Sequence, residues 1–182
     1  MGSGYGIRCK TCDYKFNVIL GHGMFECGFL ENKYGSSKAC FYDRINDDKV
    51  ITDIERLRSA HGKSMKECGC VDEHEWRGHG RSPYLCPHCF TLDTCYYFKL
   101  QYPGGNYEPI YACPNCGSDM KRIKIKIQGH VGADIEQYTF RADDDTIISF
   151  VDANGEPFNW RCPTCNGSEI MYDKDASSIC FD

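Results

Sequence analysis

The chain has 182 residues, of which 41% are hydrophobic and 26% charged, with 14 cysteines and a formal net charge of −5. These values indicate an ordinary globular protein of one or two domains, and no apolar run is long enough to predict a membrane segment. We expect a cytoplasmic protein, because the N-terminus lacks the apolar core of a signal peptide. In a reducing compartment cysteines serve more often as metal ligands than in disulfides.

The first half of the chain predicts a few strands and one helix. Short strands flank the first cysteines over residues 5–20, and apolar spacing predicts a helix over residues 47–61 that ends at Gly62. A polar loop rich in glycine is expected over residues 62–82.

The second half of the chain predicts strands. Apolar and polar residues alternate in KRIKIKIQ at residues 121–128, and Asn154-Gly155 is typical of a tight hairpin turn. The expected fold class is therefore α+β, mainly β, with short antiparallel strands and one helix.

Four cysteine pairs share the spacing C-x-x-C: Cys9 and Cys12, Cys86 and Cys89, Cys113 and Cys116, and Cys162 and Cys165. A tight turn can present both sulfurs of a pair to one ion, and two turns complete a tetrahedron. In three pairs a proline fixes φ after the first cysteine, and Gly117 permits the positive φ that closes its turn. Redox-active pairs are less favoured, because a thioredoxin-like site uses one pair in a βαβ unit. The pattern predicts two structural zinc ions held by these eight cysteines.

The sequence leaves open which pairs share an ion. Adjacent pairing leaves 73 and 45 intervening residues, whereas nested pairing leaves 23 between the inner pairs and 149 between the outer pairs. The spacing of 23 favours the nest, but the inserts at residues 41–62 and 121–161 suggest two successive elaborated ribbons. We predict adjacent pairing, with one zinc ribbon over residues 1–100 and another over residues 101–182, and keep the nest as the alternative.

The turns that hold these pairs resemble the knuckles of zinc-ribbon proteins. GIRCKTCDYKFNVILGHGMF, followed by YLCPHC, YACPNC and WRCPTC, is similar to small uncharacterised bacterial proteins with two four-cysteine zinc ribbons. CKTCDYKF also resembles the first knuckle of a rubredoxin, but the 73-residue gap departs from the compact spacing of that family. The resemblance covers the knuckles and residues 5–25, and it implies zinc binding without an established activity.

A further set of metal-capable side chains lies in the polar loop: Cys68, Cys70, His74 and His79. Their spacing is not that of a common structural zinc site, so an exposed loop is favoured over a third metal ion. His88, inside CPHC, is expected to project into solvent. The acidic run at residues 143–145 lacks the spacing of a calcium loop.

No catalytic motif is present, and a zinc ion held by four cysteines has no open position for water. The leading hypothesis is a non-enzymatic module that binds a protein partner. The alternative is nucleic-acid binding through Arg122, Lys124 and Lys126 on one strand face, with the aromatic run at residues 96–98 stacking on bases. The net negative charge opposes it. A third hypothesis is a redox protein that uses iron or thiols, and the oligomeric state is left open.

Overall fold

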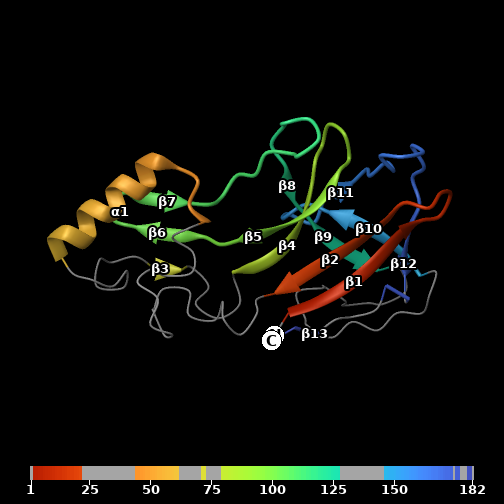
Figure 1. Cartoon of the computed structure of the whole chain (residues 1–182), viewed down its shortest axis with the longest axis horizontal. Helices are drawn as coiled ribbons and strands as arrows, with labels where there is room; N and C mark the ends of the chain where they lie inside the picture. The colour runs from red at the N-terminus through yellow and green to blue at the C-terminus, as the bar shows by residue number, and fades with distance from the viewer. Residues whose placement is uncertain are drawn as a thin grey trace. The chain divides into compact units, whose positions relative to one another are not determined.

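The computed structural model describes residues 2–21, 44–61, 71–72, 79–127, 146–173, 175–176 and 180–181. These residues form one α-helix and short β-strands (Figure 1), so the mainly β class expected from the sequence is confirmed. The helix is α1 (Asp48–His61). The strands are β1 (Gly2–Cys9), β2 (Lys15–Gly21), β3 (Val71–Asp72), β4 (Gly80–Leu85), β5 (Leu92–Tyr97), β6 (Leu100–Tyr102), β7 (Gly105–Tyr107), β8 (Lys121–Arg122), β9 (Lys124–Ile127), β10 (Ile147–Val151), β11 (Pro157–Phe158), β12 (Ile170–Asp173) and β13 (Cys180–Phe181).

The larger sheet is antiparallel and curls until its pairings form a closed circuit. β1 pairs with β2, β2 with β4 through Gly21 and Arg81, and β4 with β8. The chain continues through Ile123 into β9, which pairs with β10; β10 then pairs with β12, and β12 returns to β1. Strands that are distant in sequence are therefore neighbours in space, as β1 and β12 are in Figure 1.

Alternation along the strands fills the inside of this curled sheet with apolar side chains. In the KRIKIKI segment Ile123 and Ile125 are buried while Lys126 is exposed, which confirms the predicted period of two. Phe150 is also buried and meets Trp160 edge to face, with ring centroids 6.2 Å apart. The core lies between the strands that carry the cysteines.

The chain divides into two compact units. The first contains the described residues of 1–21, 81–95 and 111–182, and the second contains those of 22–80 and 96–110. This division differs from the boundary predicted at residue 100, because β4 and β8 bring chain from both sides of that boundary into one sheet. All four cysteine pairs fall in the first unit.

The second unit combines α1 with a small sheet in the order β3-β6-β7. Val50 and Ile54, on one face of the helix, share a buried cluster with Phe98, Leu100 and Tyr107. The helix begins one residue later than predicted, and Gly62, its predicted stop, lies outside the described residues. Within the predicted polar loop at residues 62–82, the described residues include β3 and the start of β4 at Gly80. Residues 62–70 and 73–78 of this loop lie outside the described residues.

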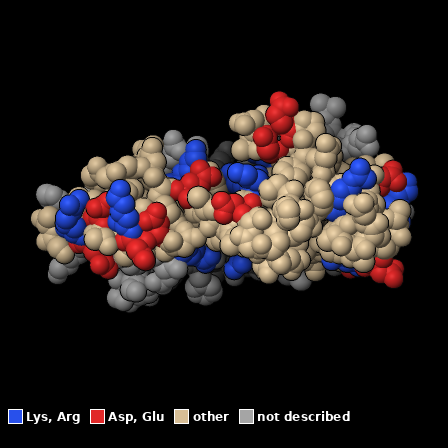
Figure 2. Space-filling view, turned by 90° about the horizontal axis from the view of Figure 1, so that it is seen from above, with Lys and Arg blue, Asp and Glu red and all other residues tan. Residues whose placement is uncertain are grey.

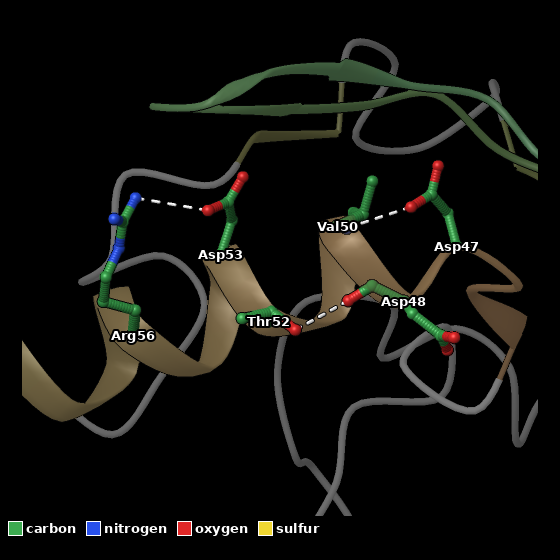
Figure 3. Close-up of polar contacts among 6 residues, drawn as sticks. All are labelled: Asp47, Asp48, Val50, Thr52, Asp53 and Arg56. Atoms are coloured by element: carbon green, nitrogen blue, oxygen red, sulfur yellow. Dashed lines mark hydrogen bonds and ion pairs between the residues drawn. The ribbon is translucent and has the colours of Figure 1, made fainter.

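An aspartate caps the start of α1. The carboxylate of Asp47 accepts hydrogen bonds from the backbone N–H groups of Lys49 (2.9 Å) and Val50 (3.2 Å), as Figure 3 shows for Val50. One turn later the hydroxyl of Thr52 donates to the carbonyl of Asp48, and Arg56 pairs with Asp53 at 3.2 Å. The cap satisfies donors that a helix start leaves unpaired.

Glycine is required in β1 where the chain after β12 crosses it. A Cβ added at Gly6 would collide with the Cβ of Ala176 and would lie 2.7 Å from the carbonyl oxygen of Asp173. Gly6 also pairs with Asp173 in the strand register. A bare backbone at this position therefore permits the close approach of the C-terminal segment.

We expect Gly6→Ala to lower the free energy of unfolding by about 2 kcal/mol, because the added methyl group must displace backbone atoms. Asn17→Ala is the matched control, since Asn17 pairs with Gly6 from β2 and is exposed. Its effect should stay within about 0.5 kcal/mol. Denaturant titration of the protein measures both, and equal stabilities would contradict the crossing.

Candidate metal centres

The eight cysteines of the four pairs form two groups of four. The outer group consists of Cys9, Cys12, Cys162 and Cys165, and the inner group of Cys86, Cys89, Cys113 and Cys116. Within each group all four sulfur atoms lie within 4.8 Å of one another. Each group could therefore hold a metal ion.

The grouping is nested, so the predicted adjacent pairing is wrong. Cys9 ends β1 and lies opposite Ile170 in β12, which follows directly after the last knuckle. Similarly, Leu85 is the last residue of β4 and directly precedes Cys86. It pairs with Lys121 in β8, just after the third knuckle. The 23-residue spacing pointed to this nest, whereas the inserts that favoured adjacent pairing do not reveal the strand pairing that decides which sulfurs meet.

All four knuckles repeat one backbone hydrogen bond. The N–H of the first cysteine donates to the carbonyl oxygen five residues later: Cys9 to Tyr14 (2.9 Å), Cys86 to Thr91 (2.9 Å), Cys113 to Ser118 (2.8 Å) and Cys162 to Gly167 (2.7 Å). The shared bond fixes the chain around each pair of sulfurs in the same way.

Three knuckles are closed by a residue in the left-handed conformation. Gly117 has φ of 75°, as predicted, and the equivalent residues Phe90 and Asn166 have φ of 59° and 61°. Each donates its N–H to the carbonyl of the first cysteine of its knuckle, at 3.0 Å for Phe90 and 2.8 Å for the other two. In the first knuckle the equivalent residue is Asp13, which is not among the described residues with positive φ.

The distances between sulfur atoms fit a shared metal ion. Across the outer group, Cys9 lies 3.6 Å from Cys165 and Cys12 lies 3.6 Å from Cys162. The inner group gives 3.5 Å and 3.4 Å for the corresponding contacts. A disulfide requires about 2.0 Å, whereas tetrahedral zinc with bonds of about 2.3 Å separates its sulfurs by about 3.8 Å. The described cysteines form no disulfide.

The last cysteine of each group is exposed and becomes a thiolate easily. Hydrogen bonds from the backbone and then the hydroxyl of Ser118 lower the pKa of Cys116 to about 6. The hydroxyl of Thr11, followed by the backbone N–H of Gly167, lowers the pKa of Cys165 to about 6. Each group therefore offers one anionic sulfur near neutral pH, which is the form that binds metal.

Two threonine hydroxyls support the sulfurs, and the sequence analysis missed both. The Oγ1 of Thr11 lies 3.2 Å from the sulfur of Cys9 and 3.1 Å from that of Cys165, so it bridges the two knuckles of the outer group. In the inner group the Oγ1 of Thr91 lies 3.1 Å from the sulfur of Cys89 and accepts a hydrogen bond from Asn115 at 2.8 Å. Such outer contacts orient metal ligands.

Among the described residues, the other sequence-predicted candidates do not join these groups. His79 is buried beside the ring of Tyr96, and Cys68, Cys70 and His74 lie outside the described residues, as does the run 143–145. His88 is exposed, as predicted. The aromatic run 96–98 is buried, with exposed fractions of 6% or less, which opposes the part of the alternative hypothesis in which these rings stack on bases.

Comparisons with protein-family models, with curated proteins and with solved structures give no match for this chain. Among the described residues no helix is long and apolar enough to cross a membrane. The site itself defines a protein with two four-cysteine groups that could bind metal ions.

The nested grouping predicts which cysteine variants resemble one another. Cys9→Ser and Cys162→Ser should each remove the outer metal ion and leave the inner one, while Cys86→Ser and Cys113→Ser should do the reverse. Metal content and proton–nitrogen NMR spectra of the four variants measure this. Matching spectra for Cys113→Ser and Cys162→Ser would instead show adjacent pairing.

Proposed function

We propose that both groups hold zinc and that the chain is a non-enzymatic module in which the two ions act as structural cross-links. The observation that carries this proposal is the arrangement of four sulfurs in each group, with contacts of 3.4–3.6 Å. Zinc favours four-sulfur tetrahedral sites, and sites closed by four protein ligands are typically structural. In the outer group Cys9, Cys12, Cys162 and Cys165 would be the ligands, and in the inner group Cys86, Cys89, Cys113 and Cys116.

Elemental analysis of protein purified without added metal should give about two zinc ions per chain, one for each group of four sulfurs. Removing them should unfold the curled sheet, because a four-cysteine zinc site contributes on the order of 10 kcal/mol to folding. Circular dichroism and NMR after chelation measure the loss. A coloured protein with iron–thiolate absorption bands would support the iron carrier instead.

We further propose that the module binds a protein partner through its exposed knuckle tips. In the inner group Pro87 and His88 project from one tip, and Pro114 and Asn115 from the other, and all four are exposed. The backbone of both tips is fixed by the repeated knuckle hydrogen bonds, so a partner would meet a surface that is already ordered. On the face in Figure 2, basic and acidic side chains are interspersed, which favours a protein over a polyanion.

The partner is tested by capture from a lysate on full-length protein. His88→Ala should abolish capture while both zinc ions remain, and Asn106→Ala, an exposed change in the second unit, should not. Capture that survives His88→Ala would exclude this tip. Retention on heparin that falls steeply with salt and is lost in Lys124→Gln with Lys126→Gln would favour nucleic acid instead.

A further inference from the structure

The chain contains two Asn-Gly sequences, Asn154-Gly155 and Asn166-Gly167. In such a pair the backbone nitrogen of glycine can attack the side-chain carbonyl carbon of asparagine, because glycine has no side chain to hinder the approach. A new C–N bond forms and ammonia leaves, which gives a succinimide. Water then opens the ring to aspartate or isoaspartate, so no oxidant, reductant or other reactant is needed.

Both residues of the second pair fit particular places in the outer knuckle. Asn166 closes the knuckle with φ of 61°, a conformation that few residues other than glycine and asparagine adopt without strain. At Gly167 an added Cβ would collide with the hydroxyl of Thr11 and would lie 3.2 Å from the sulfur of Cys165. The geometry of the metal group thus places a chemically reactive dipeptide beside one of its own ligands.

The folded knuckle also holds this dipeptide in an unreactive state. The N–H of Gly167 donates to the sulfur of Cys165, and the carbonyl of Gly167 accepts a hydrogen bond from Cys162 at 2.7 Å. The N–H of Asn166 donates to the carbonyl of Cys162 at 2.8 Å. The attacking nitrogen must lose its proton and turn toward the asparagine side chain, and these contacts oppose both steps.

We propose that Asn166 is a modification site guarded by the outer metal ion: while the ion is bound Asn166 is preserved, and when it leaves Asn166 deamidates. This inference rests on the proposed metal occupancy. In isoaspartate the main chain runs through what was the asparagine side chain. The former main-chain carbonyl becomes a free carboxylate next to the thiolate of Cys165. The knuckle could not then close in its original form, so modification makes loss of the outer ion permanent.

The chain supplies an internal control in the first Asn-Gly pair. Asn154 is exposed in the hairpin between β10 and β11, where the N–H of Gly155 donates to the carbonyl of Asp152 at 3.1 Å. The side chain of Asp152 also accepts hydrogen bonds from the N–H groups of Asn154 and Glu156. This turn contains no cysteine, so its rate of deamidation reports on folding without direct contact to either group.

The test incubates zinc-loaded full-length protein at mildly alkaline pH with and without a chelator and measures both asparagines by peptide mass spectrometry. Chelation should accelerate conversion of Asn166 by about tenfold or more, because it opens the knuckle. The rate at Asn154 shows how much of this acceleration comes from unfolding of the sheet that carries its hairpin. Cys9→Ser should accelerate Asn166 even with zinc present, whereas Cys113→Ser, which empties the inner group, should not.

Equal rates at Asn166 with and without chelator would overturn the inference, as would equal acceleration of Asn166 in Cys9→Ser and Cys113→Ser, which indicates general unfolding. Asn166→Gly keeps a residue suited to positive φ and cannot deamidate. After prolonged chelation and return of zinc, this variant should recover both ions and the wild type only the inner one. Zinc content before incubation tests the proposed function separately. If two zinc ions are bound but chelation does not change the rate of deamidation at Asn166, only this inference fails.

Discussion

The meeting of four sulfurs from two knuckles is the constraint on which the structure depends. Each group lies beside a pair of strands that are distant in sequence. These are β1 and β12 at the outer group, and β4 and β8 at the inner group. Zinc bound to four thiolates contributes free energy on the order of 10 kcal/mol, comparable with the whole stability of a small domain. Metal ions held as proposed would therefore cross-link the curled sheet and be held in place by it.

The nested arrangement has a modest entropic cost. The loop between the outer pairs has 149 residues and the loop between the inner pairs has 23. Because the closure entropy of a flexible loop grows only with the logarithm of its length, the longer loop costs about 2 kcal/mol more. This difference is small beside the binding of a metal ion. The 23-residue spacing favoured the observed nest, and the inserts at residues 41–62 and 121–161 led to the wrong prediction; the strand register decided the pairing.

Each knuckle combines rigid backbone geometry with exposed chemistry. Repeated backbone hydrogen bonds fix the turn, while Cys116 and Cys165 stay accessible and have lowered pKa values. Thr11 contacts the sulfur of Cys165, and the space beside that sulfur leaves no room for a side chain at Gly167. A metal group of this kind orders the surface that a partner would contact, and it also exposes that surface to damage when the metal is lost.

The sequence by itself determined the local features: the eight cysteines, the left-handed Gly117, the alternation of Ile123 and Ile125 and the helix of the second unit. These depend on short-range geometry, which residue type and spacing encode. Only the tertiary structure decided the pairing of knuckles, the supporting role of Thr11 and Thr91 and the burial of the aromatic run 96–98. All three follow from contacts between strands that are distant in sequence, and nothing in the local pattern specifies which strands pair.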